Sequence, residues 1–147
     1  MKKKRSIPGK ILRVLAAVLV AGHAFLTIAI PQSAQAFSGG GTGTAGDPYR
    51  ITSCSQLSEM NSSNEHFLLR GTLNCSSVSF SPIANFTGVL DGRNHSITNI
   101  NYTSSGDNVG LFATLNGATI KNLSISSSTF LGRNYVATIA GVAYNNA

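Results

Sequence analysis

The sequence predicts an all-β fold in which short strands wind into stacked coils, a β-solenoid, and two observations favour it. Residues 96–102 resemble residues 119–125 further along the chain, and a fixed repeat of roughly 20 to 50 residues is typical of stacked folds. The matching positions are Ile97 and Ile120, Asn99 and Asn122, Ile100 and Leu123, and Tyr102 and Ile125. Each repeat also consists of short β-type runs broken by Gly, Asn and Ser, without the period of about 3.6 residues that marks an amphipathic helix.

Residues 1–36 have the features of a secretory signal peptide. Positions 1–13 hold six cations and no acid, which equals the formal net charge of +6 for the whole chain. An apolar run over residues 14–30 follows, and then the small-residue site Ala34-Gln35-Ala36, so we expect cleavage before Phe37. The alternative is an uncleaved membrane anchor, which the lack of a basic stop-transfer cluster after the apolar run disfavours.

A signal peptide also predicts where the chain works. We expect export through the general secretory route to the periplasm, the cell surface or the medium, with membrane contact only through the signal peptide. After residue 36, five cations face five acids. Because these charges balance, the high isoelectric point does not indicate a nucleic-acid partner.

Two elements are expected before the repeats begin. Residues 37–46 are mostly Gly, Ser and Thr and predict a flexible lead-in to the solenoid domain, residues 47–147. Ser53 followed by Gln56 fits a capping box, and Leu57 and Met60 have helical i, i+3 spacing, so a short amphipathic helix over about residues 54–61 is expected. Such a helix would cover the open end of the first coil, whose strand edge would otherwise be unpaired.

The two cysteines are expected to form a disulfide. Cys54 and Cys75 are the only cysteines, and their separation along the chain is close to the repeat length, so stacked coils would place them side by side. An exported chain reaches an oxidising compartment, which favours the bond. Two separate buried thiols remain the alternative.

Asparagines mark the expected bends. Ile97, Ile100 and Tyr102 are spaced by three and then two positions, whereas a single strand facing the core would need a spacing of two throughout. Asn99 and Asn122 lie at the break, and Asn tolerates the left-handed conformation well. We therefore expect Asn99 to stack on Asn122, as Ile97 on Ile120 and Ile100 on Leu123, with the two amides forming a ladder.

Several short motifs in a fixed order resemble one family. They are Asp47-Pro48-Tyr49-Arg50-Ile51 with Gln56-Leu57, Pro82-Ile83, Phe86-x-Gly88-x-Leu90-Asp91-Gly92-x-x-His95-x-Ile97-x-Asn99-Ile100, Val109-Gly110-Leu111-Phe112, and Ala118-Thr119-Ile120-Lys121-Asn122-Leu123. This arrangement resembles the N-terminal part of bacterial exported proteins that carry GLUG repeats. The resemblance implies a right-handed parallel β-helix on a bacterial surface, serving as a stalk, adhesion or matrix element. Residues 135–146 look like a further GLUG repeat with Ala137 in place of its first Gly. We therefore expect the solenoid domain to be incomplete at Ala147, as either the N-terminal piece of a longer protein or a truncated reading frame.

The sequence predicts no catalytic, cofactor or metal site. Carbohydrate-cleaving sites need clustered or paired carboxylates, but no two of the five acids after residue 36 are one repeat apart. Neither an H-E-x-x-H nor a G-x-S-x-G motif is present. Asp91, Arg93 and His95 form the most compact polar cluster, and we interpret it as part of a turn.

These observations favour a non-enzymatic exported β-solenoid module that acts as a surface scaffold or adhesion element. Its expected partners are a glycan or a cell-surface or matrix protein, and its apolar C-terminal coil predicts end-to-end self-association. The alternative is an N-terminal fragment of a carbohydrate-active β-helix enzyme, a polysaccharide lyase or hydrolase, with its catalytic coils beyond residue 147.

Overall fold

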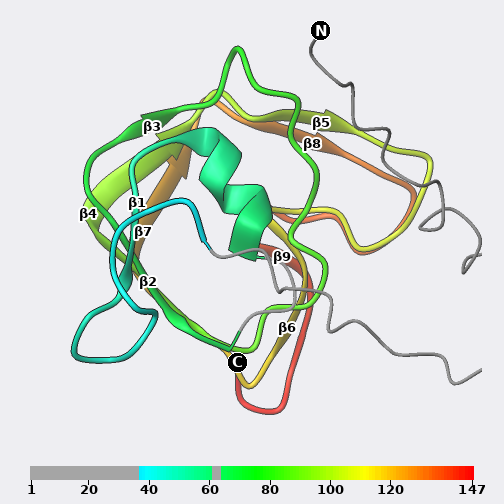
Figure 1. Ribbon diagram of the computed structural model, residues 1–147. Helices are drawn as coiled ribbons and strands as arrows, with labels where there is room; N and C mark the ends of the chain where they lie inside the picture. The colour runs from blue at the N-terminus through cyan, green and yellow to red at the C-terminus, as the bar shows by residue number, and fades with distance from the viewer. Residues whose placement is uncertain (1–36, 61–63) are drawn as a thin grey trace, which may run out of the picture. The chain divides into compact units, whose positions relative to one another are not determined.

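The computed structural model describes residues 37–60 and 64–147, and strands dominate this part of the chain (Figure 1). The strands are β1 (Tyr49–Ile51), β2 (His66–Leu69), β3 (Leu73–Asn74), β4 (Val89–Thr98), β5 (Asn101–Thr103), β6 (Phe112–Asn116), β7 (Thr119–Ser126), β8 (Thr129–Leu131) and β9 (Ala140–Tyr144). A single helix, the 3-10 helix η1 (Cys54–Met60), accompanies them in the described part. The all-β prediction is confirmed. The predicted signal peptide and its cleavage site lie outside the described residues.

All strand pairs of the described residues are parallel, and they form three sets. The largest sheet has the order β1, β2, β4 and β7, with β3 beside the second half of β4, while β5 pairs with β8 and β6 with β9. The strands β4, β5 and β6 therefore form one layer, and β7, β8 and β9 form the next layer in the same order. Parallel neighbours cannot be joined by a tight turn, so the chain leaves each strand and returns beside it one layer later.

The predicted stacking register is wrong. Leu90, and not Ile97, lies opposite Ile120, and Ile97 lies opposite Ile125. Asn101 of β5 likewise lies opposite Thr129 of β8. These two layers are therefore further apart in sequence than the repeat predicts, and Ile97 does not stack on Ile120, nor Ile100 on Leu123.

The error has a physical cause, because one local motif is used at two different bends, which lie in adjacent layers. Asn99 and Asn122 both have positive φ, 59° and 53°, so the predicted bends are confirmed. However, the backbone N–H of Asn99 bonds to the carbonyl of Ser126, beside the positive-φ residue Ser127, whereas Asn122 lies opposite the bend at Arg93 and Asn94. The repeat in the sequence reports bend geometry and not stacking.

Side-chain amides do join neighbouring layers, but not as the expected Asn99–Asn122 ladder. Asn99 Nδ2 donates to Asn74 Oδ1 at 3.0 Å, and Asn122 Nδ2 donates to Asp91 Oδ1 at 3.1 Å. Asn145 and Asn116, in the last two layers, are bonded in the same way. Each such bond links a bend to a strand or bend of the preceding layer.

The core lies between the three sets of strands. Ile97 and Ile100 are fully buried, and the other apolar residues of the repeat, Tyr102, Ile120, Leu123 and Ile125, pack against the core while partly exposed. Phe86 lies between Phe67 and Phe112, with ring centroids 5.9 and 5.1 Å away. The predicted inward orientation of these apolar positions is therefore confirmed.

The helix η1 closes the end of the core near β1. Gln56 Oε1 accepts hydrogen bonds from the backbone N–H of Ser53 at 3.1 Å and of Thr52 at 2.7 Å, which is the Gln half of the predicted capping box. Leu57 and Met60 are fully buried in the core, and Figure 1 shows η1 crossing in front of the strands. The element confirms the predicted short amphipathic helix, as a 3-10 helix and not an α-helix.

Residues 37–46 are not the flexible lead-in that their composition indicates. The ring of Phe37 packs on Tyr49 and Phe67, and the carbonyl of Gly40 accepts a hydrogen bond from Arg50 in β1 at 2.8 Å. Gly41 has a φ of 108°, a conformation that suits glycine and lets the chain turn back on β1. The segment thus covers the outer edge of β1.

The predicted disulfide is confirmed. Cys54, the first residue of η1, is bonded to Cys75, with the two Cα atoms 5.5 Å apart. Cys75 follows β3, so the bond attaches the covering helix to the strand layers.

Candidate functional site

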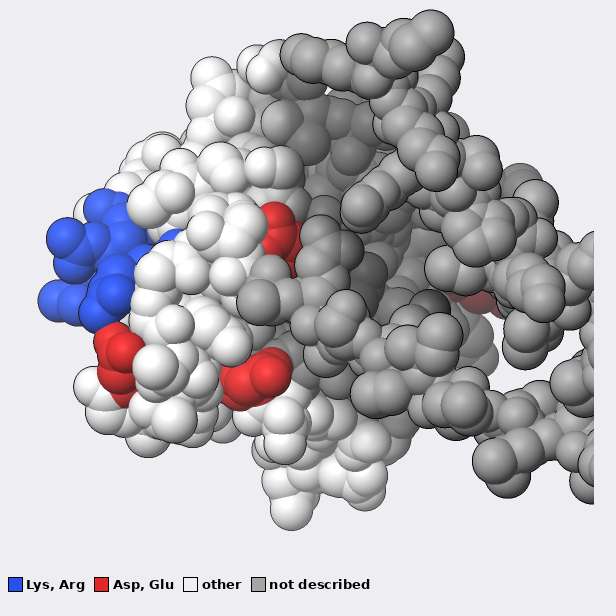
Figure 2. Space-filling model, in the orientation of Figure 1, with Lys and Arg blue, Asp and Glu red and all other residues white. Residues whose placement is uncertain are grey.

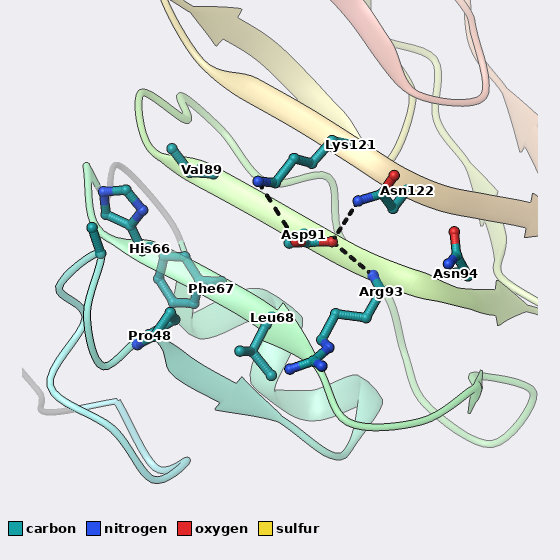
Figure 3. A pocket seen from close by; sticks show the side chains of 11 residues that line it. Pro48, His66, Phe67, Leu68, Val89, Asp91, Arg93, Asn94, Lys121 and Asn122 are labelled. Carbon is teal, nitrogen blue, oxygen red and sulfur yellow. Dashed lines mark hydrogen bonds and ion pairs between the residues drawn. The ribbon is translucent and has the colours of Figure 1, made fainter.

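A groove of about 440 Å³ lies on the outer face of the sheet that β2, β4 and β7 form (Figure 3). Leu68, Asp91 and Lys121 are register partners across these strands. They alternate along their strands with Phe67, Leu90 and Ile120, which pack inward, so they point outward. The full lining is Ala45, Pro48, His66, Phe67, Leu68, Val89, Asp91, Arg93, Asn94, Lys121 and Asn122.

Asp91 is at the centre of the groove and has three donors around it (Figure 3). Its carboxylate accepts from the backbone N–H of Arg93 at 2.9 Å and from Asn122 Nδ2 at 3.1 Å, and Lys121 Nζ is 3.6 Å away. These donors stabilise the ionised form, so the pKa of Asp91 is lowered, first by the Arg93 N–H and then by Asn122.

We expect the titration of Asp91 to show this environment. By NMR its midpoint should lie below the ordinary Asp value of about 3.9, and Asn122→Ala should raise it because one donor is lost. A group whose pKa is lowered by folding stabilises the fold above its unfolded pKa, and this contribution disappears as the pH falls through the folded pKa. Asp107, whose pKa is lowered chiefly by Arg133, is the internal control. An Asp91 midpoint that Asn122→Ala leaves unchanged would contradict the assignment.

A β-bulge shapes one end of the groove. Between Asp91 and His95 three residues of β4 lie opposite the single residue Asn122 of β7. Arg93 and Asn94 both have positive φ, 48° and 61°. Bulges redirect side chains, and Figure 3 shows the Arg93 side chain running beside Leu68.

The groove carries more positive than negative charge. Arg93 and Lys121 line it, with Asp91 as its single acid. Figure 2 shows that Lys and Arg side chains gather on the side of the molecule where β1, β2, β4 and β7 lie in Figure 1. Among the described residues, no side chain forms an ion pair with Arg93.

The sequence identified part of this site. Of the predicted polar cluster, Asp91 and Arg93 both line the groove, whereas His95 does not. Lys121 and Asn122 come from β7 and were missed as partners of Asp91, because the register predicted from the repeat places Lys121 elsewhere. His66 of β2 was missed as a further lining residue. The Asp-Gly-Arg-Asn run could have indicated a bulge, since Gly and Asn both tolerate the positive φ that a bulge can require.

A second charged cluster joins the last two layers. Arg133 Nε and Nη2 bond to the two carboxylate oxygens of Asp107 at 2.9 and 3.0 Å, and Asn134 Nδ2 donates to Asp107 at 3.0 Å. Its charges are paired with each other, so it acts as a clamp between loops and leaves no obvious unpaired charge for a ligand.

The described residues contain neither a three-ligand metal cluster nor a membrane-spanning helix. No three His, Cys, Asp or Glu side chains in residues 37–60 and 64–147 lie where they could hold a metal ion together. Within the same ranges, no helix has the length and apolar character needed to cross a membrane.

Comparison with known proteins shows a similarity to Halomucin from Haloquadratum walsbyi (strain DSM 16790 / HBSQ001). The identity is 33% over 122 residues, which cover 70% of this chain and 1% of Halomucin. The chain thus spans a very small part of that protein's length. No protein-family model matches the chain, and no solved structure matches it.

Proposed function

We propose that the chain is a non-enzymatic exported module, a right-handed parallel β-helix of GLUG type that works as a surface scaffold or adhesion element. The parallel pairing of β4, β5 and β6 with β7, β8 and β9 in the same order supports the β-helix. The signal-peptide features of residues 1–36 and the similarity to a protein named as a mucin support a location at or outside the cell surface.

The observation that carries this proposal is the unequal condition of the two ends of the strand stack. Residues 37–46 and η1 cover the end at β1, as described above. At the other end, β7, β8 and β9 each have one partner strand among the described residues. Four of the five exposed large apolar residues also lie there, namely Leu131 (54%), Tyr135 (66%), Val136 (42%) and Tyr144 (45%). An open, apolar strand edge accepts further strands, as a scaffold element built by stacking requires.

We expect this edge to drive self-association. The chain from Phe37 onward should form dimers or larger species in light scattering, or show fast amide hydrogen exchange over residues 136–142. Replacing Val136 and Tyr144 by Lys should give a monomer, because charged side chains on an edge oppose strand addition. Val78→Lys, at an exposed apolar residue away from this edge, is the matched control and should leave association unchanged. A monodisperse wild-type monomer with strong protection over residues 136–142 would contradict the proposal.

The second candidate is the N-terminal part of a carbohydrate-active β-helix enzyme, which the polar groove on β2, β4 and β7 favours. Asp91 is the single acid in the groove, so an acid and base pair would need a carboxylate from coils beyond residue 147. The two functions differ in a direct assay. Release of reducing ends or unsaturated products from acidic polysaccharides by the longer natural protein supports the enzyme, and binding without product release supports the scaffold.

A further inference from the structure

We propose that the groove over β2, β4 and β7 binds a saccharide that carries a carboxylate, such as a uronate residue of an acidic glycan. This inference names the class of ligand that the proposed adhesion element would bind, and it therefore rests on the proposed function. Groove binding and self-association occur at different places in the fold, so each can be measured without the other.

The charges in the groove favour an anion. The carboxylate of Asp91 already has the Arg93 N–H, Asn122 and Lys121 around it. The guanidinium of Arg93 has no ion-pair partner among the described residues, and Lys121 approaches Asp91 no closer than 3.6 Å. A guanidinium binds a carboxylate with two parallel hydrogen bonds. A carboxylate bound between Arg93 and Lys121 would therefore form an ion pair with each of these two cations.

The backbone at Arg93 is unusual for this residue type. A left-handed conformation is uncommon for residues other than Gly and is enriched for Asn, Asp and His, yet Arg93 has a φ of 48° beside Asn94 at 61°. In β7, the single residue Asn122 lies opposite this bulge and makes the corresponding bend. Such local strain often accompanies a functional site, and here the bulge directs a long cationic side chain along the groove.

The other lining groups favour a sugar over an acidic peptide. The amides of Asn94 and Asn122 and the carboxylate of Asp91 suit hydroxyl groups, which both donate and accept hydrogen bonds. In addition, β2 and β4, which carry Leu68 and Asp91, are paired on both sides. An extended peptide could join the sheet only at the outer edge of β7 and not at the centre of the groove. The groove volume of about 440 Å³ is within the range of small-ligand pockets.

The test is an NMR titration of the wild-type chain at low salt with trigalacturonate, with neutral trigalactose and hexaglutamate as comparison ligands. We expect trigalacturonate to shift the amide signals of residues 91–94 and 121–122, and added salt to weaken binding because the contacts are ionic. Trigalactose and hexaglutamate should each bind about tenfold more weakly or worse, since each lacks half of the complementary chemistry.

Two variants test the named cations. Arg93→Asn keeps a residue that tolerates the bulge, and Lys121→Gln lies on a regular strand; each should weaken trigalacturonate binding about tenfold with an otherwise unchanged spectrum. Arg70→Gln, at an exposed arginine outside the groove, should bind as the wild type does. The inference is overturned if the groove signals do not move, if either cation variant binds normally, or if hexaglutamate or trigalactose binds equally well. Failure of binding with intact self-association would remove only this inference, and the scaffold proposal would stand.

Discussion

Phe86→Ala is expected to lower the free energy of unfolding by about 3 to 5 kcal/mol, the usual cost of emptying a buried phenylalanine site. Phe86 is fully buried, and its ring lies between those of Phe67 and Phe112. The three rings come from two adjacent layers, since Phe67 in β2 lies beside β4 and Phe86 lies beside β6. Neighbouring backbone that is held by parallel pairing cannot easily close the cavity. Urea unfolding followed by circular dichroism measures the loss.

Phe130→Ala is the matched control for this prediction. Phe130 lies in β8, in the last layer, where it is partly exposed and packs edge-on against Phe80. The Phe130 side chain removes less apolar surface from water on folding than Phe86 does. Phe130→Ala should therefore lower the free energy of unfolding clearly less than Phe86→Ala. Equal losses for the two variants would mean that the core does not run through Phe86 as described.

Removing the disulfide by replacing Cys54 and Cys75 with Ala should cost about 3 kcal/mol, the value that the chain-entropy relation gives for a loop of this size. The bond joins two cysteines with a sequence separation of 21. Amide exchange over η1 should also become faster, because Cys54 begins the helix. Thiol titration of the denatured, exported protein should find no free thiol, and two free thiols would contradict the bond.

Local chemistry made the bends and the helix predictable. Asn tolerates positive φ in any context, so Asn99 and Asn122 could be assigned to bends from their neighbours alone. The Ser53–Gln56 pair predicted η1 in the same way, because a capping box needs only residues that are close in sequence.

The stacking register needed information that local patterns lack. The sequence spacing between paired strands varies along the chain: Tyr49 lies opposite Phe67, His66 opposite Val89, and Leu90 opposite Ile120. The loops between strands differ in length, so no fixed period describes the stack. Two bends with the same local sequence then gave a false period.

The candidate site was partly missed for the same reason. Its side chains come from three strands, and only the true register places Lys121 beside Asp91. The prediction of a flexible lead-in over residues 37–46 failed for another reason. Gly-rich composition indicates a flexible backbone, but the packing of the Phe37 ring and the hydrogen bond to the Gly40 carbonyl hold this segment on β1.

Cross-linking at a defined register tests the stacked parallel arrangement most directly. Ser96 and Ser124 are opposite each other in β4 and β7, so cysteines at both positions should have Cα atoms about 5 Å apart, within the range of a disulfide. Mild oxidation and peptide mapping should find this bond in Ser96→Cys with Ser124→Cys, and none in Ser96→Cys with Thr119→Cys, the pair that the sequence repeat would align. A bond in the second pair, or in neither, would contradict the stacking on which the proposed scaffold rests.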